Sequence, residues 1–122
     1  MKENNIIVDK SYAFAVRIVN CYKFLYSEKK EFVLSKQLVR CGTSIGANVE
    51  EAVGAQSRKD FLSKLAIAYK EARETKFWIR LLRDTQIIEI KIAESLLIDV
   101  EEILKLIGSI IKTIKNDELR NS

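Results

Sequence analysis

Apolar residues recur every three or four positions through four long segments of the chain, and short polar stretches separate these segments. This spacing places apolar side chains on one face of an α-helix. The predicted helices cover roughly residues 8–27, 33–53, 57–84 and 89–115, and a short polar C-terminal tail follows. Because short connections make consecutive helices antiparallel neighbours, the pattern predicts an all-α, up-and-down four-helix bundle. We expect residues 1–122 to form one domain.

Each predicted helix carries an apolar stripe that we expect to face the core. The first helix has one line of Tyr12, Ala15, Val19, Tyr22 and Tyr26, with Phe14, Ile18 and Leu25 beside it. The stripe of the second helix consists of Leu34, Leu38, Cys41, Ile45, Val49 and Ala52. The stripe of the third consists of Phe61, Leu65, Ala68, Ala72, Thr75, Ile79 and Leu82. The stripe of the fourth consists of Ala93, Leu97, Val100, Leu104, Ile107, Ile111 and Ile114.

The break between the second and third helices has the clearest boundary signals. Gly54 follows the second stripe and predicts a helix end, since glycine adopts the left-handed conformation without a side-chain clash. Ser57 precedes Asp60 by three residues, which resembles a capping box at the start of the third helix. The start of the fourth helix near Glu89 has no comparable signal.

Several classes of protein are excluded by what the composition lacks. The chain has no proline, so long uninterrupted helices are allowed, and no histidine, which is the commonest general base and transition-metal ligand. Charged residues interrupt every apolar run well before the roughly 18 residues of a transmembrane helix. The N-terminus lacks the pattern of a signal peptide. We therefore expect a cytoplasmic protein that does not enter a membrane, with Cys21 and Cys41 reduced in the core.

The segment RCGTSIGANVEEA, residues 40–52, contains the G-x-S-x-G pattern of the serine-hydrolase nucleophile elbow around Ser44. An elbow needs a preceding strand and a histidine, whereas the period here is helical and the chain has no histidine. Gly42 and Gly46 instead lie on one helical face, where small neighbours allow close packing. Another helix, or a large aromatic residue such as Trp78 or Tyr69, could occupy this face, and the spacing leaves the choice open.

A carboxylate-bridged metal centre is a second alternative, because four-helix bundles often hold one. The candidate ligands on the second and third helices are Glu50, Glu51, Glu71 and Glu74. The di-iron pattern requires Glu-x-x-His on two helices, and this chain has no histidine. We therefore expect these glutamates to pair with nearby basic residues, and we expect no metal, no cofactor and no catalytic residue.

The third and fourth helices carry more apolar side chains than one face can hold. Ile67, Trp78 and Leu81 lie outside the third stripe, at about 100° of rotation per residue. Outside the fourth stripe lie Ile88, Ile90, Ile92, Leu96, Ile98, Ile103, Leu106 and Ile110. Scattered apolar residues also occur on monomers. Excess apolar surface nevertheless marks association sites, so we favour a homo-oligomer with Ile67, Trp78 and Leu81 at helix-packing or subunit contacts.

The net charge of +4 is concentrated in the third helix, since the rest of the chain has thirteen basic and thirteen acidic residues. Arg73, Lys76, Arg80 and Arg83 share one narrow sector of this helix, and Tyr69 precedes them by one turn. A basic stripe beside an aromatic ring can follow a phosphate backbone. Together with Lys59, these residues are the candidate nucleic-acid-binding residues. A solvated face with internal salt bridges is the alternative.

Three stretches carry a resemblance to a known family. They are VDKSYAFAVRIVNCYKFL, LSKQLVRCGTSIGANVEEAVGAQSRKDFLSKLAIAYKEARETKFWIRLL and EEILKLIGSIIKTIK. The chain resembles the four-helix bundle proteins encoded in 23S rRNA intervening sequences, a family related to the accessory variability determinant of diversity-generating retroelements. The resemblance implies a four-helix protomer, a homopentameric barrel and a role in nucleic-acid binding. The retroelement relatives also act with a reverse transcriptase.

Two functional hypotheses follow from these patterns. The first is a non-enzymatic, cytoplasmic homo-oligomer, a pentamer by the resemblance, which binds RNA or structured nucleic acid through basic helix faces. Without a base-reading motif, phosphate contacts would dominate the binding. The second is a protein-interaction scaffold, for example an accessory subunit of a reverse transcriptase.

Overall fold

The computed structural model describes residues 2–121, with side chains from residue 6 onward. The four helices are α1 (Lys2–Ser27), α2 (Leu34–Val53), α3 (Arg58–Asp84) and α4 (Ile90–Arg120). The described residues contain no strand, which confirms the all-α prediction with four helices. Residues 1 and 122 of the predicted domain lie outside the described residues.

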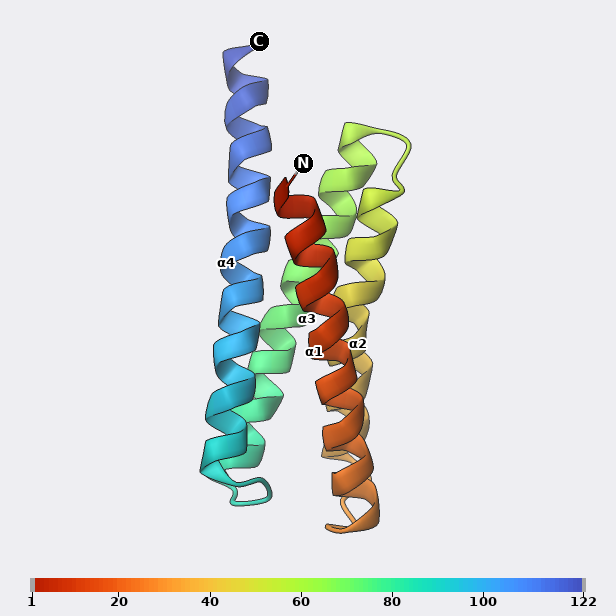
Figure 1. Ribbon diagram of the computed structural model, residues 1–122, viewed down its shortest axis with the longest axis vertical. Helices are drawn as coiled ribbons and strands as arrows, with labels where there is room; N and C mark the ends of the chain where they lie inside the picture. Colours follow the sequence, from red (N-terminus) through yellow and green to blue (C-terminus); the bar gives the residue numbers. More distant parts are fainter. Residues whose placement is uncertain (1, 122) are drawn as a thin grey trace.

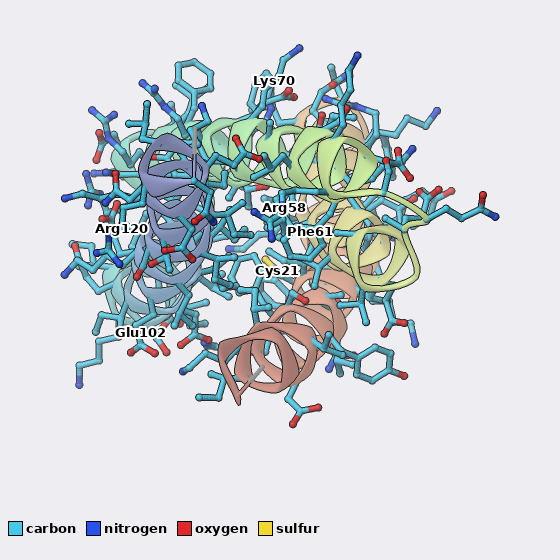
Figure 2. The ribbon with its side chains drawn as sticks, turned by 90° about the horizontal axis from the view of Figure 1, so that it is seen from above. Cys21, Arg58, Phe61, Lys70, Glu102 and Arg120 are labelled. Carbon is cyan, nitrogen blue, oxygen red and sulfur yellow. The ribbon has the colours of Figure 1, made fainter. Side chains whose placement is uncertain are left out.

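The helices alternate in direction and form a closed ring of neighbours (Figure 1). The α1–α2 and α3–α4 connections lie at one end, and the α2–α3 connection lies at the other. α1 packs on α2, α2 on α3, α3 on α4, and α4 on α1. Seen from above, the four helices enclose a shared core, towards which Cys21 of α1 is turned (Figure 2). None of the described helices has an apolar stretch of the length and purity that a bilayer span needs.

The predicted stripes of α2 and α3 are confirmed with small exceptions. In α2, the fully buried apolar residues are Leu38, Cys41, Ile45, Val49 and Ala52. In α3, the buried residues are Leu65, Ala68, Ala72, Thr75, Ile79 and Leu82. Leu34 and Phe61, at the beginning of each stripe, are only partly buried. Each of these helices has one dominant apolar face, so the pattern alone identifies the face that packs.

The main line predicted for α1 is wrong. Tyr12 and Tyr26 are 67% and 52% exposed, whereas Phe14, Ile18 and Leu25 form the buried line together with Ile7 and Ser11. α1 is apolar on more than one face, and periodicity cannot choose between such faces. Tyrosine also tolerates the outer position, because its hydroxyl remains in water while its ring covers neighbouring apolar surface.

The stripe predicted for α4 is half correct. Ala93, Val100 and Ile107 are buried as predicted, but Leu97 and Leu104 are only partly buried. Their places in the core are taken by residues that we assigned to the surface excess, namely Ile88, Leu96, Ile103 and Ile110. Only Ile90, Ile92 and Ile98 of that set remain exposed. The surplus of apolar residues on α4 is therefore smaller than the sequence pattern indicates.

The first and last helices are both longer than predicted, α1 at its N-terminal end and α4 at its C-terminal end. α1 begins at Lys2 rather than near residue 8. α4 continues through the predicted polar tail to Arg120, and the Asn121 N–H donates to the Asp117 carbonyl at 3.1 Å. Lysine, glutamate, leucine and arginine favour helix, so a polar composition does not end one. In Figure 1 this end of α4 extends beyond the start of α1.

The caps agree with the sequence in one place and differ in another. The Ser57 hydroxyl accepts the Asp60 N–H at 3.0 Å, so the predicted cap of α3 is confirmed. Gly54 ends α2 with φ −87° and ψ 7°, which is not the left-handed conformation that we expected. The left-handed conformations occur instead at Lys30 and Gln86, with φ of 54° and 64°.

Gly42 and Gly46 face α1, which answers the question left open by their spacing. A Cβ at Gly42 would lie 2.7 Å from Cγ2 of Ile18, and one at Gly46 would lie 3.3 Å from the Ser11 carbonyl oxygen. We call this surface the α1–α2 seam. Ser44 lies within α2 and its hydroxyl donates to the Arg40 carbonyl at 2.6 Å. The elbow-like motif is therefore a continuous stretch of helix.

Candidate nucleic-acid groove

Two hollows lie end to end between α3 and α4 and share Tyr69 and Gly108. Their volumes are about 640 Å³ and 420 Å³. We call the two together the basic groove. Its lining residues are Tyr69, Arg73, Lys76, Phe77, Arg80, Glu101, Leu104, Lys105, Gly108, Ile111, Lys112, Lys115 and Asn116. Both helices therefore contribute to a single elongated depression.

The lining of the basic groove is strongly positive. Six of its described residues are basic, three on α3 and three on α4, whereas Glu101 is its single acidic residue. Glu101 Oε1 lies 2.5 Å from Nζ of Lys76, so this lysine is neutralised. Within the described part of the chain, the other five have no carboxylate at ion-pair distance: Arg73, Arg80, Lys105, Lys112 and Lys115. These five positive charges are available to an anionic ligand.

Tyr69 lies where the two hollows meet, and Gly108 of α4 faces it. A Cβ at Gly108 would lie 3.7 Å from Cε2 of Tyr69, which is an ordinary contact distance. Alanine would thus fit, and glycine inside a helix costs about 1 kcal/mol relative to alanine. Gly108 leaves open space in the groove that a larger side chain would fill.

Phe77 borders the larger hollow two turns further along α3 and is 52% exposed. Its ring packs edge-on against Trp78, with centroids 5.1 Å apart and an interplanar angle of 79°. The indole is itself fixed, because Trp78 Nε1 donates to Glu74 Oε2 at 3.1 Å. Phe77 is consequently an exposed ring with a supported orientation.

Four of the six candidate nucleic-acid-binding residues line the basic groove, namely Tyr69, Arg73, Lys76 and Arg80. Arg83 does not. Its guanidinium lies 2.8 Å from Asp84 Oδ1 and 3.1 Å from Glu94 Oε1, and it borders a different hollow at the α3–α4 connection. Hydrogen bonds to Asp84 and Glu94 raise the pKa of Arg83 further above its ordinary value. Arg83 is thus already neutralised by its own chain.

Lys59 is exposed in the first turn of α3 and is also outside the groove. Ten residues separate it from Tyr69, which corresponds to about 15 Å along the helix axis. Lys70 of the same helix points away from the bundle (Figure 2). Only some of the basic residues of α3 therefore line the groove.

Sequence reasoning missed the α4 contribution of Lys105, Lys112 and Lys115. Their spacing of seven and three residues repeats that of Arg73, Arg80 and Arg83 on α3. This repetition was a usable signal. It was hidden because the acidic residues of α4 balance its basic ones, so the net charge draws attention only to α3.

The residues predicted to form helix-packing or subunit contacts have different environments. Trp78 and Leu81 are half-buried on α3, whereas Ile67 is exposed. Of the four glutamates considered as metal ligands, Glu51, Glu71 and Glu74 pair with basic residues. Arg40 of α2 contacts Glu71 at 3.4 Å and also binds Glu74, while Lys64 lies 3.7 Å from Glu51.

A further hollow of about 290 Å³ lies between α1 and α4 and is mainly apolar. Phe24 and Ile92 form part of its lining and are both exposed. Cys21 also borders this hollow, whereas Cys41 is fully buried, and both are free thiols. Burial raises the pKa of Cys41 to about 11.

Comparisons with known proteins agree with this architecture. The chain is similar to a protein of unknown function from the S23 ribosomal protein family of Bacteroides thetaiotaomicron, whose crystal structure superposes with a TM-score of 0.89. The two are 58% identical over 90% of this chain and 98% of the other. A search of curated proteins found no match. The profile of the 23S rRNA-intervening sequence protein family matches residues 3–109. Because this match covers most of the four-helix fold, the chain belongs to the 23S rRNA-intervening sequence protein family.

Proposed function

We propose that the protein binds RNA through the basic groove, mainly by contacts to phosphates, and that this role is not enzymatic. The observation that carries the proposal is a set of five positive side chains that α3 and α4 present along one depression, with no carboxylate of the described residues at ion-pair distance. Contacts of lysine and arginine side chains with phosphates release counterions from the nucleic acid into solution, and this release favours binding.

The direct test is fluorescence anisotropy with labelled RNA, repeated over a series of salt concentrations. Affinity should fall steeply with salt, with a slope of log K against log salt of about −3.5 for a single strand if all five side chains contact phosphates. A flat salt dependence, or no binding at low salt, would contradict the proposal.

The site assignment needs matched charge variants. Changing Arg73, Arg80 and Lys105 together to glutamine should weaken binding at least about tenfold and make the slope less steep by about 2. The control changes Lys23, Lys36 and Lys91 to glutamine, because these residues are exposed and do not line the groove. Equal losses in both variants would mean that net charge, rather than the groove, governs binding.

We propose further that the protein is a homo-oligomer. Large exposed apolar residues on α1 and α4 support this, including Ile6, Tyr12, Val16, Phe24, Ile90, Ile92 and Ile98. Association would also repeat the basic groove, so that weak contacts reinforce one another on a single RNA. Light scattering coupled to size exclusion gives the mass directly. The family resemblance implies a pentamer, and a monomeric mass at micromolar concentration would refute the association.

A protein-interaction scaffold is the second candidate function, for example an accessory subunit of a reverse transcriptase. The apolar hollow between α1 and α4 favours it, because Phe24 and Ile92 are exposed there in the protomer. Affinity purification from the native host would then recover a stoichiometric protein partner, and Ile92→Glu would remove it. If Ile92→Glu instead lowers the mass of the purified protein alone, the hollow belongs to the homo-oligomer.

A further inference from the structure

We infer that the basic groove selects unpaired nucleotides, whose bases stack on Tyr69 and Phe77. This inference rests on the proposed function and goes beyond it, since phosphate contacts alone would not distinguish single strands from duplexes. Grooves that bind single strands combine positive side chains with aromatic platforms for the bases. The basic groove has both.

Aromatic and basic side chains alternate along the α3 wall of the groove. Tyr69, Arg73 and Phe77 follow one another at four-residue intervals, and all three line the larger hollow. A rise of 1.5 Å per residue separates the two rings by about 12 Å along the helix axis. Bases in a duplex stack directly on one another, so their faces are covered. Only unpaired bases can present a face to rings this far apart.

Tyr69 has the position of a platform at the middle of the groove. It borders both hollows, part of its ring is buried against the core, and Gly108 opposite adds no side chain that would cover the part that remains open. Lys112 and Lys115 lie along one hollow and Arg73 and Lys105 along the other. A strand that places a base on Tyr69 therefore has positive side chains for its phosphates on either side.

Phe77 has no hydrogen-bonding group, so charge recognition does not explain why this ring borders a basic hollow. The edge contact with Trp78 and the indole hydrogen bond to Glu74 restrict how the ring can turn. A pre-oriented ring loses little conformational entropy when a base stacks on it. A stacked base would also cover the exposed apolar surface of Phe77.

The experiment compares three labelled probes that carry the same number of phosphates per strand. They are a 12-nucleotide RNA without self-complementarity, the duplex of that RNA, and an abasic oligonucleotide. Measured by anisotropy at one salt concentration, the single strand should bind at least about tenfold more tightly than the abasic probe, the change that 1.4 kcal/mol from one stacked base produces. It should also bind more tightly than the duplex.

Variants then assign the effect to the two rings. Tyr69→Leu and Phe77→Leu should each weaken single-strand binding about tenfold and leave binding of the abasic probe unchanged. Tyr69→Phe and Phe77→Tyr should retain binding, because they preserve an aromatic face. The matched control is Phe32→Leu, which changes an exposed aromatic residue of the α1–α2 connection outside the groove and should affect no probe. Circular dichroism verifies the fold of each variant.

Trp78 supplies a second readout, since it is the single tryptophan of the chain and contacts Phe77. The single strand should change its emission and the abasic probe should not. If the three probes bind equally, with the usual salt dependence, and the leucine variants bind like wild type, the inference is overturned while the proposed function stands. If no probe binds at all, both are overturned.

Discussion

Gly42 and Gly108 are both glycines inside long helices, but their surroundings are opposite. At Gly42 the partner helix is so close that a Cβ would lie 2.7 Å from Ile18, a fully buried side chain. At Gly108 a Cβ would meet only Tyr69, at 3.7 Å, and a groove remains open beside it. One glycine allows contact between two helices, and the other leaves space between two helices.

This difference separates a structural surface from a candidate binding surface. Each glycine loses about 1 kcal/mol of helix stability relative to alanine. In the α1–α2 seam, close packing against Ile18 and the Ser11 backbone offsets that loss. In the basic groove, no contact within the described protomer does so. A stability loss without internal compensation is expected where the space is kept for a ligand.

The largest expected effect is at the seam. Gly42→Val should lower the free energy of unfolding by about 3 kcal/mol, because Ile18 is β-branched, buried and unable to move away. Urea denaturation followed by circular dichroism measures this change. Wild-type stability in the valine variant would contradict the close approach of α1 to α2.

A double-mutant cycle with Ile18→Ala links the effect to this one contact. Ile18→Ala alone should cost about 2–5 kcal/mol, because it opens a cavity. In the Gly42→Val background it should cost at least about 1 kcal/mol less, since the valine fills part of that cavity. If the effects of the two substitutions on the free energy of unfolding are strictly additive, the strain in the Gly42→Val variant does not come from the contact with Ile18.

The second effect is at the groove and should have the opposite sign for stability. Gly108→Ala should raise the free energy of unfolding by about 1 kcal/mol, because it adds helix propensity without a clash. Gly108→Leu should also fold but should weaken RNA binding about tenfold by filling the groove, with no change in net charge. Urea denaturation and anisotropy measure the two quantities. Loss of stability in both variants would mean that Gly108 is a packing residue like Gly42.

A smaller effect is expected at the acidic residue of the groove. Glu101→Gln removes a negative charge and releases Lys76, which it binds at 2.5 Å. RNA affinity should rise about fivefold, the effect of roughly 1 kcal/mol from one charge near the surface. The gain should shrink at high salt. Glu102→Gln is the matched control, because Glu102 is exposed, binds Lys10 of α1 and does not line the groove.

The smallest effect belongs to the loop before α2, where Glu31 accepts the Ser35 N–H at 2.8 Å. Burial raises the pKa of Glu31, but backbone hydrogen bonds from Ser35, Leu34 and Val33 outweigh burial and hold the pKa below its ordinary 4.5. The stabilisation is therefore complete above about pH 4.5 and is lost as the pH falls through the lowered pKa. Glu31→Gln should cost about 0.5 kcal/mol at pH 7 and less at pH 3, by urea denaturation. A constant difference would contradict the capping role.

The sequence was sufficient for the number of helices and for the core faces of α2 and α3. Those two helices have one apolar stripe each, so burial follows from periodicity. It was insufficient for α1, where the line of Tyr12 and Tyr26 competes with that of Phe14 and Ile18. The orientation of α1 follows from packing with residues distant in the sequence, as at Gly42, and an ion pair of Arg17 with Asp99 at 2.6 Å joins α1 to α4. Such contacts between α1 and α4 leave no periodic trace in either helix.

The candidate site was predictable only in part, for the same reason. Arg73 and Arg80 were identified because net charge is concentrated on their helix. Lys105 and Lys112 join them only through the register of α4 against α3, which is set by packing across the core. Arg83 was chosen by its spacing, but its partner Glu94 lies across the α3–α4 connection. The basic stripe of α3 thus predicts only the α3 wall of a groove that α3 and α4 form together.

The rates at which the two thiols react with a labelling reagent can report the opening motions of the bundle. Cys41 is adjacent to Gly42 in the chain, fully buried, and has a pKa of about 11, so an alkylating reagent reaches its thiolate only when α2 separates from its neighbours. Cys21 is only half-buried beside the α1–α4 hollow, so a smaller, local opening exposes it to the reagent. The ratio of the two labelling rates therefore compares how often the protein opens locally with how often it unfolds globally, and no probe has to be introduced.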